Sequence, residues 1–197
     1  MDDSVAGMAA QLPISTDVQR AKLTARDFWT LAEAGAFEGF AKSELIEGEI
    51  WGVNSVWVWH SRTTAYLTTE LAIALRALAS PLIVYTSGSV DMSDDSVPEP
   101  DVSVGMDHRD RTGLPMSKLA LAVEVSDSTL ANDLACKARL YARHGVPEYW
   151  VVDADGQAVH QMWSPAGDAY TERRRVPFGD PLASATIPGL TIQTSGI

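Results

Sequence analysis

The chain has 197 residues and a formal net charge of −11, from 26 acidic and 15 basic side chains. This length fits one compact domain, and with 46% apolar residues a predominantly disordered chain is excluded. A single cysteine, Cys136, excludes a disulfide scaffold and fits a reducing compartment. The acidic balance excludes a protein that coats nucleic acid regardless of sequence, because such a protein needs a basic surface.

Residues 1–20 show no hydrophobic periodicity, which predicts a loose leader followed by a single domain over residues 21–197. The acidic start has no positive region followed by an apolar block, so a secretory signal is not expected. No segment reaches the ~20 apolar residues of a membrane span. We therefore expect a cytoplasmic protein that makes no membrane contact.

The first half of the chain predicts helix, hairpin, helix. A capped helix is expected from Thr24 to about Gly35. The alternating segment SELIEGEIWGV predicts a β-hairpin that turns at Gly48. An irregular link over residues 54–59 then leads into a helix over residues 61–79, where apolar side chains recur near a 3.6-residue period.

The second half is dominated by strands around one helix. Strands are predicted for LIVYTSGSVDM with a break at Gly88, DVSV, LALAVEV, EYWVVD, QAVHQMW and AYTERRRV, the last at an edge. The runs LALAVEV and EYWVVD are nearly continuous in apolar residues, which is typical of strands buried on both faces. A helix over residues 132–144 separates these two strands. The order favours an α/β fold, a mixed sheet with helices packed on it.

Two carboxylates lie within apolar strand segments, Asp101 beside Val102 and Glu124 between Val123 and Val125. A buried carboxylate is costly unless it is paired or bound to a cation. If the two strands are neighbours, the carboxylates can share one divalent ion, and oxygen ligands suit magnesium or manganese. The alternative is two strand-end acids that reach water or a salt bridge.

Lys137 lies on the helix that follows the Glu124 strand, four residues after Asp133. This spacing allows an ion pair between the two side chains on a solvated helix face. The alternative is that the Lys137 ammonium reaches over the carboxylates and stabilises charge on a phosphate. The pattern leaves both interpretations open.

Several blocks together resemble one protein family: ELIEGEI, EPDVSV, LAVEVSDST, DLACKARLYARHGVPEYWVVD and IPGLTI. They are similar to the Uma-two family, described as putative restriction endonucleases, a branch of the PD-(D/E)XK nuclease superfamily. The resemblance spans roughly Thr24 to Ile192. It implies a restriction-endonuclease-like fold, a mixed β-sheet flanked by helices with an N-terminal helix and hairpin.

The resemblance also implies roles for individual residues. Asp101, in the PD element, and Glu124 match the two acidic metal ligands, and the carbonyl of Val125 matches a backbone ligand. The superfamily lysine would fall at Ser126 and is absent there. In this family the lysine stands on the following helix, which here is Lys137.

Two further positions match family residues outside this set. Glu44, in ELIEGE, is a candidate additional catalytic acid. His60 matches a common family histidine, and we interpret it as a hydrogen-bond partner at the helix start rather than as a catalytic group.

The implied activity is magnesium- or manganese-dependent hydrolysis of DNA phosphodiester bonds by an endonuclease. Residues 1–101 carry 15 acids and 6 bases, so we expect DNA binding that is weak, metal-dependent and sensitive to salt. The bases at 137–143 and 173–175 are the expected contacts to the DNA backbone. The exposed sheet edge near residues 157–176 makes a homodimer the expected assembly.

Two other functions stay open at this stage. One is a catalytically silent protein of nuclease fold that binds DNA or metal, or has a structural role. The other is an unrelated acid–base hydrolase that uses Glu44 and Glu124, which requires both side chains in one cleft.

Overall fold

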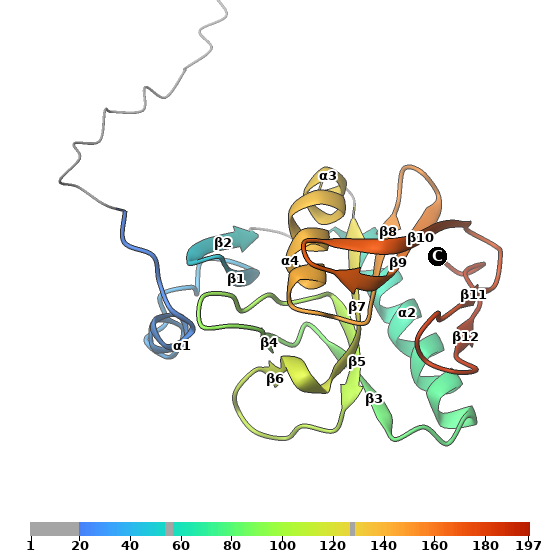
Figure 1. Cartoon of the computed structure of the whole chain (residues 1–197), viewed down its shortest axis with the longest axis horizontal. Helices are drawn as coiled ribbons and strands as arrows, with labels where there is room; N and C mark the ends of the chain where they lie inside the picture. Colours follow the sequence, from blue (N-terminus) through green and yellow to red (C-terminus); the bar gives the residue numbers. More distant parts are fainter. Residues whose placement is uncertain (1–19, 54–56, 127–128) are drawn as a thin grey trace, which may run out of the picture.

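The computed structural model describes residues 20–53, 57–126 and 129–197 (Figure 1). A six-stranded sheet forms its centre. In spatial order the strands are β10 (Ala169–Pro177), β9 (Ala158–Ala166), β8 (Glu148–Asp153), β7 (Leu119–Ser126), β5 (Val102–Met106) and β3 (Leu82–Thr86). β7 and β8 run parallel and the other neighbours antiparallel, which confirms the predicted mixed sheet. The predicted leader falls almost wholly outside the described residues.

Helices cover both faces of the sheet, with α2 and α4 on opposite sides of β7 (Figure 1). One face packs against α2 (Val58–Ala77). The other packs against a continuous helical segment made of α3 (Leu130–Asn132), a π-helical turn η2 (Asp133–Lys137) and α4 (Ala138–Arg143). The central strands β7 and β8 are therefore buried on both faces, as their apolar runs predict.

The N-terminal helix and hairpin are also confirmed. In α1 (Ala25–Glu33), Thr24 and Asp27 form a reciprocal capping box. Strand β1 (Lys42–Ile46) pairs with β2 (Glu49–Val53) through a two-residue turn. Both turn residues, Glu47 (φ 49°) and Gly48 (φ 82°), are left-handed, the conformation that closes a tight hairpin.

Short elements complete the fold. β4 (Val90–Asp91) pairs with β6 (Leu114–Pro115), η1 (Met116–Lys118) precedes β7, and β11 (Leu182–Ala183) pairs with β12 (Thr191–Ile192). Among the described residues, none of the helices combines the length and apolar character needed to cross a membrane.

Three predicted boundaries are wrong. Residues 54–56 of the expected link lie outside the described part, but Val58 and Trp59 are already helical, since Trp59 packs against the core on that face of the sheet. The second long helix begins at Leu130, two residues early, and contains the π-helical turn. Asp101 stands one residue before β5 rather than inside a strand.

Candidate active site

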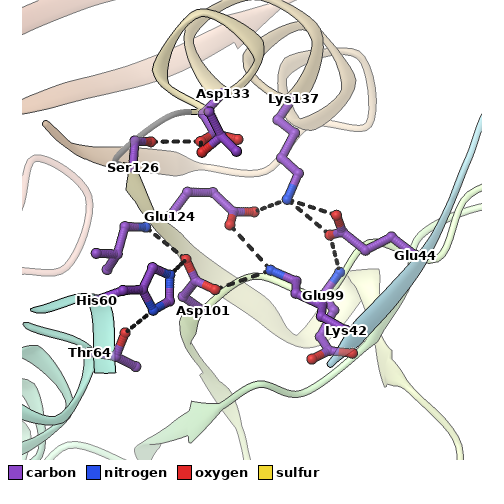
Figure 2. Close-up of polar contacts among 12 residues, drawn as sticks. Lys42, Glu44, His60, Thr64, Glu99, Asp101, Glu124, Ser126, Asp133 and Lys137 are labelled. Atoms are coloured by element: carbon purple, nitrogen blue, oxygen red, sulfur yellow. Dashed lines mark hydrogen bonds and ion pairs between the residues drawn. The ribbon is translucent and has the colours of Figure 1, made fainter. Parts of the chain in front are cut away.

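The predicted site residues converge on a cavity of about 290 Å³ between the hairpin, the start of α2 and the η2 turn (Figure 2). Lys42 and Glu44 come from β1, His60 from α2, Glu124 from β7 and Lys137 from η2. Alternate residues of β1 and of β7 point to the same face, which places Lys42 with Glu44 and leaves Glu124 on the α4 side of the sheet. Segments far apart in the sequence thus build a single polar cavity.

Asp101 lies where β5 and β7 separate. Ladder pairing ends at Val102 and Val123, and the backbone N–H of Val125 instead donates to Asp101 Oδ2 at 2.8 Å. His60 Nε2 lies 3.0 Å from the same oxygen. Burial alone would raise the pKa of Asp101, but the hydrogen bond from His60 and the charge of Lys42 hold it well below its usual range. Asp101 is therefore an ionised ligand candidate in a fixed orientation.

Glu124 is surrounded by donors, with only 3% of its side chain exposed. Oε1 accepts hydrogen bonds from Lys137 Nζ at 2.9 Å and from the Tyr141 hydroxyl at 3.0 Å. Burial raises its pKa to about 7, although the ammoniums of Lys137 and Lys42 act in the opposite direction. The ionised form of Glu124 therefore depends on neighbouring positive charge.

Lys137 bridges two acids instead of pairing along its own helix. Its Nζ donates to Glu124 and, at 3.0 Å, to Glu44, and these carboxylates raise its pKa although burial alone would lower it. Asp133, the partner proposed for a solvated helix face, accepts from the hydroxyls of Ser126 and Thr129 instead. The surface ion-pair interpretation is therefore wrong, and Lys137 is a buried member of the site.

Glu44 and Glu124 do share one cleft, as an acid–base hydrolase would require. Both contact Lys137, and Glu44 also accepts the backbone N–H of Glu99 at 2.7 Å. Because both carboxylates bind the same Lys137 ammonium, neither is free to exchange protons with a substrate.

Sequence reasoning missed Lys42 and Glu99. Lys42 Nζ lies 3.1 Å from Asp101 Oδ1 and 3.6 Å from Glu124 Oε2. Glu99 is half-buried next to this group, and burial raises its pKa to about 7. The available signal was the period of two in β1, which places Lys42 on the same face as Glu44.

A divalent cation fits the chemistry of this donor set. Asp101 and Glu124 already share one positive charge, the Lys42 ammonium, and the Val125 carbonyl points to the same strand edge as the N–H that binds Asp101. Within the residues that the structure describes, no three His, Cys, Asp or Glu side chains are already gathered as a ready metal cluster. The fit therefore rests on two carboxylates that already share a positive charge and on one backbone carbonyl.

Comparison with known proteins supports this picture. The chain is similar to a solved structure described as a putative nuclease belonging to DUF820 from Anabaena variabilis ATCC 29413, with a TM-score of 0.59 and 16% identity. The alignment covers 89% of this chain and 93% of that one, and at this identity it shows a shared fold. No curated protein matches the chain. The Uma2 family model, described as putative restriction endonuclease, matches residues 31–195, and the protein therefore belongs to the Uma2 family.

Proposed function

We propose that this protein is a divalent-metal-dependent endonuclease that hydrolyses DNA phosphodiester bonds. One observation carries the proposal: two buried carboxylates that line one cavity, Asp101 and Glu124, share the Lys42 ammonium. Lys137 places a second positive charge beside them. The family description, putative restriction endonuclease, agrees with this chemistry.

Asp101, Glu124 and the Val125 carbonyl would hold a magnesium or manganese ion. When bound, such an ion polarises a phosphate and lowers the pKa of a coordinated water. Without the ion, the three carboxylates of Glu44, Asp101 and Glu124 outnumber the ammoniums of Lys42 and Lys137, so we expect only weak contact with a phosphodiester.

The chain's own residues prepare the site. His60 and the Val125 N–H fix the orientation of Asp101. Lys137 orients Glu124 and Glu44, and in the proposed reaction its positive charge would stabilise the negative charge that develops on the phosphate.

A homodimer stays a prediction. The outer strand β10 is an exposed sheet edge, but Glu172, Arg173, Arg174 and Arg175 make it strongly charged. Charged edges disfavour direct strand pairing between copies. We therefore expect any dimer to use another surface, and the arginines to contribute to DNA binding. Light scattering of the purified protein measures its oligomeric state.

Conversion of supercoiled plasmid to the nicked circle tests the proposal, because an exonuclease cannot cut a closed circle that has no strand end. We expect nicking with magnesium or manganese, none with EDTA, and none by Asp101→Ala. Asp107→Ala, which removes an exposed acid outside the cavity, is the matched control and should nick like the wild type. Equal nicking by Asp101→Ala would indicate a contaminating nuclease and reject the assignment.

The silent binding protein makes a different prediction in the same assay. It would bind the divalent ion in calorimetry yet leave plasmid, linear DNA and RNA intact. Retained metal binding with no turnover on any of these substrates would favour it over the endonuclease.

A further inference from the structure

The Lys42 ammonium lies between the two proposed metal ligands. Its Nζ is 3.1 Å from Asp101 Oδ1 and 3.6 Å from Glu124 Oε2, and Figure 2 shows it joined to both. Only 13% of the Lys42 side chain is exposed. The carboxylates of Glu124, Glu44 and Asp101 raise its pKa although burial alone would lower it, so it is charged. The Lys42 ammonium, with a charge of +1, thus lies where the proposed function requires an ion with a charge of +2.

An ammonium and a divalent ion cannot share this position. Like charges a few ångströms apart repel strongly among buried side chains, and the carboxylate oxygens have few lone pairs left to serve both. Binding of the ion therefore requires the Lys42 head group to leave, and a lysine can do so because its charge sits on a flexible four-carbon stem.

A second position for this ammonium is built into the structure. Lys42 also lines a neighbouring cavity of about 520 Å³, together with Glu99 and Thr68. Among the described residues only the backbone N–H of Glu99 makes a hydrogen bond, and its carboxylate has no hydrogen-bond or ion-pair partner, so this acid is open to an ammonium that lines the same cavity. Rotation of the Lys42 stem would move the charge from one acidic pair to this single acid.

We propose that in the metal-free protein the Lys42 ammonium occupies the position of the divalent ion and holds Asp101 and Glu124 together. When the ion binds, the ammonium moves to Glu99. This proposal rests on the proposed function. It makes Lys42 a positioning residue that competes with the metal, and Glu99 the acid that receives it. This exchange stabilises the acidic cavity when no metal is bound, and it sets the metal concentration at which the ion binds.

Calorimetric titration with magnesium chloride tests the proposal. Lys42→Met should bind the ion roughly tenfold or more tightly than the wild type, because no charge-assisted hydrogen bonds are given up. Lys118→Met, whose ammonium contacts Asp107 and His108 away from the cavity, is the matched control and should bind like the wild type.

Glu99→Gln should change affinity in the opposite direction, about threefold weaker or more, since the displaced ammonium loses its partner. This effect should vanish in the Lys42→Met background, where there is no ammonium to receive. A loss that persists in the double variant would show that Glu99 acts directly on the ion and would overturn its role as receiver.

Equal or weaker binding by Lys42→Met would overturn the proposal. Absence of magnesium and manganese binding in every protein would instead reject the metal site of the proposed function. If Lys42→Met does not fold, a wild-type crystal soaked in manganese chloride decides. Manganese between Asp101 and Glu124 with Lys42 Nζ at Glu99 supports the exchange, and an ammonium still between the two ligands overturns it.

Discussion

Two buried glutamates lie in neighbouring strands, Glu124 in β7 and Glu148 in β8, and different groups stabilise their carboxylates. Glu124 is 2% exposed and Glu148 0%. The nearest partners of Glu124 include two ammoniums. Six uncharged donors surround Glu148: the side chains of Trp150, Gln161, Ser184 and Thr186 and the backbone N–H groups of Ala185 and Thr186.

The two environments shift the pKa in opposite directions. Burial alone would raise the pKa of Glu148, but hydrogen bonds from Ser184, Gln161 and Trp150 lower it. For Glu124, burial dominates and raises the pKa to about 7. Fixed neutral donors make Glu148 a permanent anchor of the C-terminal segment to the sheet. Glu124 is instead balanced by the ammoniums of Lys42 and Lys137, and positive charge is what a carboxylate needs if it is to hold a cation.

The largest expected effect is on activity. Glu124→Gln should reduce plasmid nicking by roughly 10³-fold, because the cavity loses one of the two carboxylates proposed to hold the metal ion. Glu148→Gln, the matched control in the next strand, should nick at the wild-type rate at temperatures where it is folded. Comparable losses in both variants would remove the distinction between the two carboxylates.

The next effect is on stability. Glu148→Gln should lower the free energy of unfolding by about 3 kcal/mol, since the new amide turns a donor toward donors and several buried groups lose their acceptor. Urea denaturation at pH 7 measures this. We also expect faster proteolysis near residues 182–192, where the anchored segment pairs in β11 and β12. A loss under about 1 kcal/mol would contradict the anchoring role.

A pH series in EDTA separates the two groups further. The unfolded chain binds protons more readily at Glu148 than the folded one, so this group's stabilisation is present above pH ~4.5 and is lost as the pH falls below it. Glu124 has the opposite sign: its folded pKa of about 7 exceeds the ordinary 4.5, so its contribution falls as the pH rises between these values.

The measurement is the free energy of unfolding in urea from pH 3 to 8. Glu148→Gln should flatten the acid side of the wild-type curve, and Glu124→Gln should flatten its fall toward neutral pH. If both substitutions changed the same side, the opposite pKa shifts would be wrong.

Local pattern predicts much of this fold. The runs around Glu124 and in β8 read as buried strands because nearly every side chain is apolar, and the alternation around Gly48 identifies the hairpin. The same reasoning selects Asp101 and Glu124, since a carboxylate among valines needs a cation or donor.

Contacts between distant segments could not be predicted this way. Lys42 meets Asp101 across 59 residues, and Glu148 meets Thr186 across 38. In the sequence Glu148 is simply a polar residue at a strand start, and Lys42 one at a hairpin start. Their partners become visible only when the sheet brings these segments together.

The smallest expected effect concerns Tyr141, which donates to Glu124 from four residues beyond Lys137, on the same side of the helix. Tyr141→Phe keeps the ring, which packs on Tyr149 at 4.7 Å between centroids, and removes only the hydroxyl. We expect a loss of about 1 kcal/mol in unfolding free energy, because Lys137 still satisfies the same carboxylate oxygen.

Activity should fall only a few-fold in Tyr141→Phe, since Glu124 keeps its charge and its ammonium partners. Tyr170→Phe provides the control: its hydroxyl donates to the Val146 carbonyl, outside the cavity, and its removal should cost similar stability without changing the nicking rate. A rate loss in Tyr141→Phe as large as in Glu124→Gln would mean that the hydroxyl, rather than the paired ammoniums, controls the carboxylate. Glu124 would then depend on a neutral hydrogen-bond donor, as Glu148 does, and the proposed difference between the two carboxylates would be wrong.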